Sequence, residues 1–97
     1  MVPSLNDRDH VAMERKELEG RLLALGVSVA DRLTVEQQGW FAEFVGVGEY
    51  GLALEMIADW LSEDHLPITA WERLEAKDLA EAMGNADRVM GPLALCP

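Results

Sequence analysis

The sequence lacks the features that stabilise or anchor proteins outside the cytoplasm. Cys96 is the single cysteine among 97 residues, which excludes an internal disulfide and the class of small disulfide-rich secreted domains. The longest stretches without Asp, Glu, Lys or Arg are nine residues, at 22–30 and 89–97. A membrane-spanning helix needs about 20 apolar residues, and the N-terminus lacks the apolar segment of a secretory signal. We therefore expect a cytoplasmic protein without a membrane segment.

Basic residues are also scarce. The sequence contains eight Lys and Arg residues and 18 Asp and Glu residues, which gives a net charge of −10. This excess disfavours direct binding to nucleic acid or to an anionic membrane and favours a basic protein partner. Two histidines and one cysteine provide no zinc-ligand spacing, and the glycine-rich stretch at 46–51 lacks the lysine of a phosphate-binding loop. We expect no metal, no cofactor and no enzymatic activity.

The β-branched residues Val, Ile and Thr number only 12, whereas Leu, Ala, Glu and Met together number 42. This ratio predicts an all-α fold. The length suits one domain over 1–97, a compact bundle or array of four to five short amphipathic helices. We expect residues 1–8 to form a flexible tail and residues 85–97 an irregular C-terminal end. Periodicity leaves open whether the helices pack antiparallel or orthogonally.

Glycines and capping residues predict the helix boundaries. Leu18, Leu22 and Leu25 have helical spacing, which predicts a first helix over 9–25 with Gly26 as its C-cap. A further helix is expected over 49–64.

Two capping boxes predict where the other two helices begin. They are Thr34 with Gln37, and Thr69 with Glu72. We expect helices from Thr34 to Val45 and from Thr69 to Met83.

Several residues are expected to be buried or closely packed. Helical spacing predicts that the last of these helices buries Trp71, Leu74, Leu79 and Met83. We expect each of the three tryptophans to pack in the core rather than at an interface. Gly39 lies inside a predicted helix, where glycine costs about 1 kcal/mol relative to alanine. This cost predicts that another backbone approaches closely there.

The negative charge is concentrated in the middle of the chain. Residues 33–72 contain eight acidic residues and no Lys or Arg, so they carry −8 of the net −10. Glu55, Asp59 and Glu63 follow one another at intervals of four and form a row about 12 Å long on one helix face. Like charges at this spacing destabilise a helix by about 0.2 to 0.5 kcal/mol per pair, and no base lies one turn away to relieve them. Two alternatives follow: a solvated face that aids solubility, or a binding face.

The candidate binding residues combine these acids with an aromatic side chain. An aromatic residue among acids is a common interface anchor. The candidates for contact with a partner are Glu49, Tyr50, Glu55, Asp59, Glu63 and Asp64.

One stretch of the sequence is similar to a known family. Residues 48–55 read GEYGLALE, and they are followed by acids at 59, 63 and 64 and by Leu-Pro-Ile-Thr at 66–69. Together with Arg-Leu-Thr at 32–34, this pattern resembles the MafI-like family of small bacterial immunity proteins over roughly residues 31–84. The resemblance implies an inhibitor of a polymorphic or contact-delivered toxin, encoded beside it and protecting the producing cell.

The leading hypothesis is therefore an immunity protein that neutralises a toxin domain, expected to be a nuclease with a basic cleft. The free protein is expected to be a monomer or a weak homodimer. The alternative is a small acidic adaptor or regulatory subunit that self-associates through the apolar tail at 91–97 and recruits a basic partner. A mimic of nucleic acid that acts on a DNA-binding protein is a third possibility.

Overall fold

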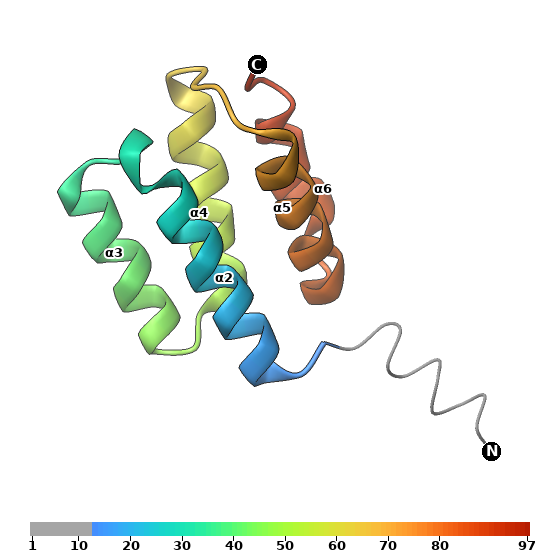
Figure 1. Ribbon diagram of the computed structural model, residues 1–97. Helices are drawn as coiled ribbons and strands as arrows, with labels where there is room; N and C mark the ends of the chain where they lie inside the picture. Colours follow the sequence, from blue (N-terminus) through green and yellow to red (C-terminus); the bar gives the residue numbers. More distant parts are fainter. Residues whose placement is uncertain (1–12) are drawn as a thin grey trace.

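The computed structural model describes residues 13–97, which form five α-helices and one short 3-10 helix, with no strand among them. The elements are α2 (Arg15–Val29), η1 (Ala30–Arg32), α3 (Val35–Gly46), α4 (Tyr50–Glu63), α5 (Ala70–Met83) and α6 (Ala86–Leu93). Successive helices run in opposite directions, with α2 lying between α3 and α5 and with α4 and α6 behind them (Figure 1). The predicted all-α fold is confirmed, and its architecture is an antiparallel bundle.

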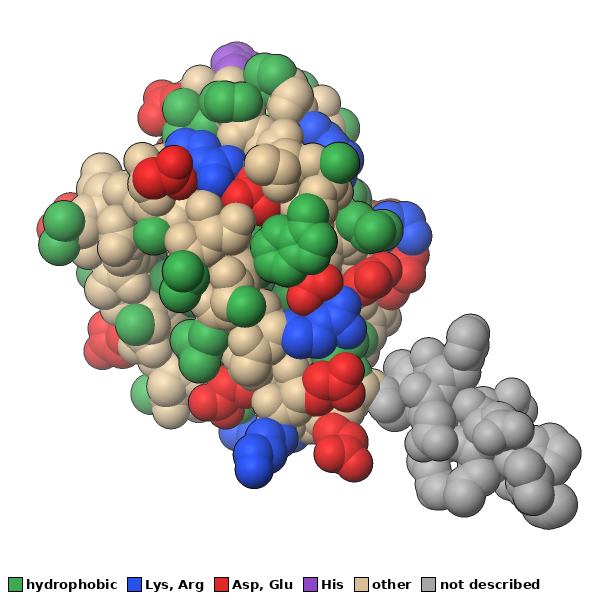
Figure 2. Space-filling model, viewed as in Figure 1, with side chains coloured by type: hydrophobic (Ala, Val, Ile, Leu, Met, Phe, Trp, Pro, Cys, Tyr) green, Lys and Arg blue, Asp and Glu red, His purple; other side chains and the backbone are tan. Residues whose placement is uncertain are grey.

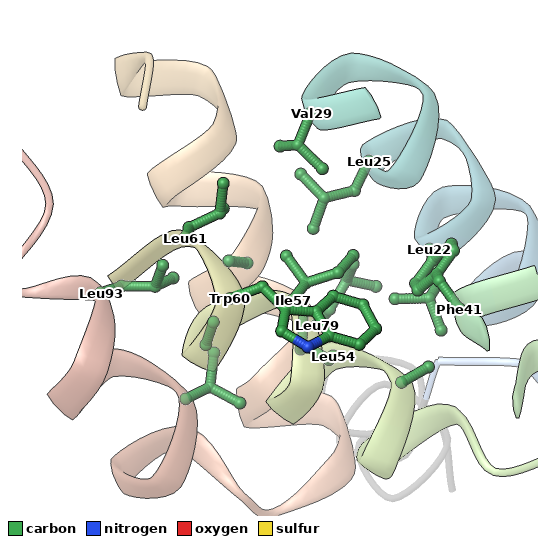
Figure 3. Close-up of a cluster of buried hydrophobic side chains, with 14 of the residues drawn as sticks. Leu22, Leu25, Val29, Phe41, Leu54, Ile57, Trp60, Leu61, Leu79 and Leu93 are labelled. Atoms are coloured by element: carbon green, nitrogen blue, oxygen red, sulfur yellow. The ribbon is translucent and has the colours of Figure 1, made fainter. Parts of the chain in front are cut away.

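Helix α4 occupies the centre of the bundle, where it contacts each of the other α-helices. Leu54, Ile57 and Leu61 of α4 belong to one buried cluster with Leu25 of α2 and Leu79 of α5 (Figure 3). All five side chains are almost completely buried. Burial of each such side chain contributes about 1.5 to 3 kcal/mol. None of the helices within residues 13–97 has the length and apolar character required to cross a bilayer.

Both predicted capping boxes are present. The Thr34 side chain accepts a hydrogen bond from the Gln37 N–H, and the Gln37 side chain accepts one from the Thr34 N–H, each at 3.0 Å. Thr69 and Glu72 make the same reciprocal pair at the start of α5. These bonds satisfy backbone donors that have no partner within the helix.

The first helix differs from its prediction because Gly26 does not end it. Helix α2 begins at Arg15 and continues to Val29, and the predicted start at residue 9 lies outside the described residues. A Cβ atom on Gly26 would lie 2.3 Å from Cε2 of Phe41. Gly26 therefore serves the packing of α3 against α2 and not the termination of α2.

Two packing predictions are wrong. A Cβ on Gly39 would meet nothing within 4 Å, so no backbone approaches there. On α5, Trp71 and Leu74 are 50% and 58% exposed, although we expected them to be buried. The residues that α5 buries are instead Glu72, Ala76, Leu79 and Ala80. The small alanines suit a helix that packs between α2 and α6, and they leave the bulky side chains outside.

The C-terminal segment is more regular than expected. Residues 85–97 were predicted to be irregular, but α6 occupies most of them and buries Val89 and Leu93 one turn apart. The end of the chain is also held in place, because the Arg73 guanidinium donates to the carbonyls of Leu93 at 2.9 Å and Cys96 at 2.8 Å. The spacing of Val89 and Leu93 gives α6 an apolar side that α4 and α5 cover.

Gly26 and Gly39 provide a matched pair of glycine-to-alanine tests. Gly26→Ala is expected to lower the free energy of unfolding by about 1 to 2 kcal/mol, because the cost of displacing the buried Phe41 ring exceeds the gain in helix propensity. Gly39→Ala is expected to raise it by about 0.5 to 1 kcal/mol, because the added methyl group meets no other atoms. Urea denaturation measures both changes, and equal effects of the two substitutions would contradict the assigned packing.

Candidate binding surface

The predicted acidic row on α4 is partly neutralised by α6. The Arg88 guanidinium donates to both carboxylate oxygens of Asp59, at 3.0 and 2.8 Å, and its Nε lies 3.8 Å from a Glu55 oxygen. Asn85 donates to the other Glu55 oxygen at 3.0 Å. The bond to Asp59 raises the pKa of Arg88. As the sequence indicates, no base lies one turn away along α4, but a partner for Glu55 and Asp59 comes from a different helix.

Tyr50, which we predicted to contact a partner, is buried within the bundle. Its side chain is only 8% exposed, and its hydroxyl donates to Glu19 at 2.7 Å. The Arg15 guanidinium lies over the ring, 5.3 Å from its centroid. Tyr50 therefore joins the start of α4 to α2.

The other three predicted site residues are exposed acids. Glu49 precedes α4, whereas Glu63 and Asp64 lie at its C-terminal end. A helix of this length separates its ends by about 20 Å, at 1.5 Å per residue. The structure thus does not bring the six candidates together on one patch.

The hairpin formed by α3 and α4 carries a row of apolar side chains, which we name the Trp40 seam. It consists of Trp40 and Phe44 on α3, Val47 at the C-cap of α3, and Leu52, Met56 and Trp60 on α4. The rings of Trp40 and Trp60 lie 6.3 Å apart and are tilted by 33°. Phe44 and Met56 pack partly buried against the core. The seam is therefore continuous with the core, and its outer edge reaches solvent.

Three residues of the Trp40 seam are substantially exposed. Trp40 is 46% exposed, Val47 69% and Leu52 39%. The expectation that every tryptophan packs in the core is correct for Trp60, which is buried, and wrong for Trp40. The seam was missed in the sequence because its two halves belong to different helices.

Acidic side chains border the Trp40 seam on both helices. Glu36 and Glu43 lie within one helical turn of Trp40 along α3, and Glu63 follows Trp60 by three residues on α4. All three are exposed. Residues 33–72 contain no Lys or Arg, so the hairpin has no cation of its own beside the seam.

A second apolar area lies on the face that Figure 2 shows. Hydrophobic side chains are spread there over α2, α3 and α5, mixed with both acidic and basic groups. A groove of about 200 Å³ lies between α2 and α3, lined partly by Leu23, Val27 and Ala42. The half-exposed Trp71 of α5 is the second exposed tryptophan. In contrast to the seam, this face has charges of both signs.

The most strongly perturbed ionisable pair, Arg32 and Glu72, has a structural role. Both terminal nitrogens of Arg32 donate to Glu72 at 2.7 Å, and Ser28 Oγ and the Thr69 N–H also donate to this carboxylate. Glu72 is 2% exposed. The hydrogen bonds from Arg32 have the largest effect and lower the pKa of Glu72 to about 2, although burial of the carboxylate acts in the opposite direction. A fully hydrogen-bonded carboxylate of this kind joins η1 and α2 to α5, a role that the capping box alone does not indicate.

Neither a metal-binding cluster nor an activated thiol is present among the described residues. No cluster of three His, Cys, Asp or Glu that could hold a metal is present within residues 13–97. Cys96 is buried, and desolvation raises the pKa of its thiol, which disfavours the nucleophilic thiolate.

In comparisons with known proteins, the sequence matches no family model, no curated protein and no solved structure. The similarity to MafI-like immunity proteins accordingly stays a prediction based on its motif.

The buried Arg32–Glu72 pair predicts a loss of stability in acid. The pKa of Glu72 is lowered from 4.5 to about 2, so its stabilising effect is present above pH 4.5 and is lost as the pH falls toward 2. Glu72→Gln is expected to lower the free energy of unfolding at pH 7 by about 3 kcal/mol, because it leaves the Arg32 guanidinium with the exposed Asp31 as its remaining charged partner. Below pH 4.5 the difference from the unchanged protein should shrink.

Urea denaturation between pH 7 and pH 2.5 measures this difference. Glu63→Gln, at an exposed acid, is the control and should alter stability by less than about 0.5 kcal/mol. A constant difference between Glu72→Gln and the unchanged protein across this pH range would contradict the assigned pairing.

Proposed function

We propose that this protein is an immunity protein that neutralises a bacterial toxin domain with a basic surface. The observation that carries the proposal is the exposed acidic surface of the α3–α4 hairpin, which has no Lys or Arg in residues 33–72. The resemblance of residues 48–55 to the MafI-like family supports the same function.

The proposed mechanism is occupation of a positively charged surface that the toxin needs. Nucleases bind polyanionic substrates and present basic clefts, and acidic side chains can take the place of phosphates there. Opposite charges also accelerate association, by up to about a thousandfold over uncharged partners at low salt. The exposed acids Glu36, Glu43, Glu63 and Asp64 are available for this role, whereas Glu55 and Asp59 already contact Arg88.

The alternative of a self-associating adaptor relied on the apolar tail at 91–97. Leu93 and Cys96 of this tail are buried in the bundle. The Ile68 N–H donates to the Pro97 carbonyl at 3.3 Å. Because the fold already uses these groups, the tail offers Leu95 as its main exposed apolar side chain, and the structure gives this alternative little support.

Co-expression tests the proposed function directly. The reading frame immediately upstream of this gene is expressed alone and together with it in a susceptible bacterium. We expect growth arrest from the first and normal growth from the second, with the two proteins purifying as a complex. Absence of toxicity, or toxicity that this protein does not relieve, would contradict the proposal.

Charge reversal tests the electrostatic mechanism in that complex. The triple variant Glu43→Lys, Glu63→Lys and Asp64→Lys is expected to weaken affinity at least a hundredfold, measured by calorimetry at two salt concentrations. These positions lie near helix C-termini, where lysine is favourable, so the fold should persist.

The matched control reverses three exposed acids outside residues 33–72. They are Glu17, Glu81 and Asp87. This control changes the net charge equally and should weaken affinity less than tenfold. Equal losses in both triple variants would show that net charge alone determines binding and would contradict a specific acidic face.

A further inference from the structure

We propose that the Trp40 seam is the docking site for a basic amphipathic helix of the partner. This inference rests on the proposed function, because it assigns the surface through which the basic partner is held. It also differs from the sequence-based prediction, which placed the contact on the row of Glu55, Asp59 and Glu63.

The exposed side chains of the seam form a suitable apolar contact. Trp40 and Leu52, 46% and 39% exposed, border a line along which α3 and α4 lie side by side, and Val47 continues it toward the turn. Tryptophan is among the residues that most often dominate binding energy at interfaces. The α3 half of the seam runs seven residues from Trp40 to Val47, or about 10 Å, which matches roughly two turns of an incoming helix.

The charges around the seam specify the chemistry of the occupant. Glu36 and Glu43 border it along α3, and Glu63 borders it along α4. Arg88 of α6, which contacts α4, is held in an ion pair with Asp59. An apolar strip with acids on both sides complements a helix with an apolar stripe between Lys or Arg residues.

The same charges disfavour a second copy of this chain as the occupant. A symmetric dimer through the seam would place Glu36, Glu43 and Glu63 of one copy near the same acids of the other. Like charges brought together at an interface disfavour association. Trp71 provides a control, because it is 50% exposed on α5 and lies one helical turn from Glu75, which pairs with Arg21, so charges of both signs are close to it.

A synthetic peptide provides the test independently of any toxin. The probe is a 14-residue peptide of Leu and Lys with the leucines at helical spacing, and the reference peptide has the same composition with the leucines distributed around the helix. Isothermal titration calorimetry measures the affinity of each peptide for the full-length protein. We expect the amphipathic peptide to bind at least tenfold more tightly than the reference peptide.

Paired variants then locate the binding site. Trp40→Ala is expected to weaken binding at least tenfold, whereas Trp71→Ala, at an equally exposed tryptophan, should change it less than twofold. Val47→Ser should weaken binding about threefold, whereas Val35→Ser, on the side of α3 away from the seam, should have no effect. Circular dichroism checks whether Trp40→Ala folds. If it does not, the valine pair still decides the test.

Three outcomes would overturn the inference: no measurable binding of the amphipathic peptide, equal affinity for the two peptides, or equal effects of the paired variants. None of these outcomes requires the toxin. If co-expression still protects cells in such a case, the seam is rejected and the proposed function stands. If the peptide binds at the seam but co-expression gives no protection, the proposed function fails and the docking surface is retained.

Discussion

Burial of α4 by the other helices is the constraint on which the rest of the structure depends. Leu54, Ile57 and Leu61 on one side of α4 form the centre of the core (Figure 3). A helix buried on one side must present its other side to solvent or to a partner, and that side carries Leu52, Glu55, Asp59 and Glu63. The core thereby sets the orientation of the candidate binding surface.

Three of the eight basic residues form ion pairs that join different elements of the bundle. Arg21 donates to both oxygens of Glu75, at 2.8 and 2.7 Å, and so joins α2 to α5. Arg32 joins η1 to α5 through its ion pair with Glu72, and Arg88 joins α6 to α4 through its ion pair with Asp59. These three guanidinium groups pair with acids of neighbouring helices, whereas the exposed acids of α3 and of the C-terminal end of α4 lie in a part of the sequence without Lys or Arg. Stability and negative surface charge thus arise from the same distribution of residues.

The features predicted correctly are those determined by local chemistry. The capping boxes at Thr34 and Thr69 depend on side chains three residues apart, and both are present. The wrong predictions concern contacts made across the bundle. Gly26 was interpreted as a helix stop because its contact with Phe41, on the next helix, leaves no local signal. The row on α4 was interpreted as unrelieved because Arg88 lies 29 residues beyond Asp59 in the chain.

By itself, the sequence determined the helical class, the starts of α3 and α5 and the absence of Lys and Arg from residues 33–72, because propensity, capping and composition act over a few residues. Only the tertiary structure decided which acids are exposed and which tryptophans reach solvent. Trp40 and Trp60 lie in similar local sequence, yet packing buries one and leaves the other half exposed. Side-chain exposure depends on how neighbouring helices are rotated about their axes, and that rotation is set by the fit of the whole core.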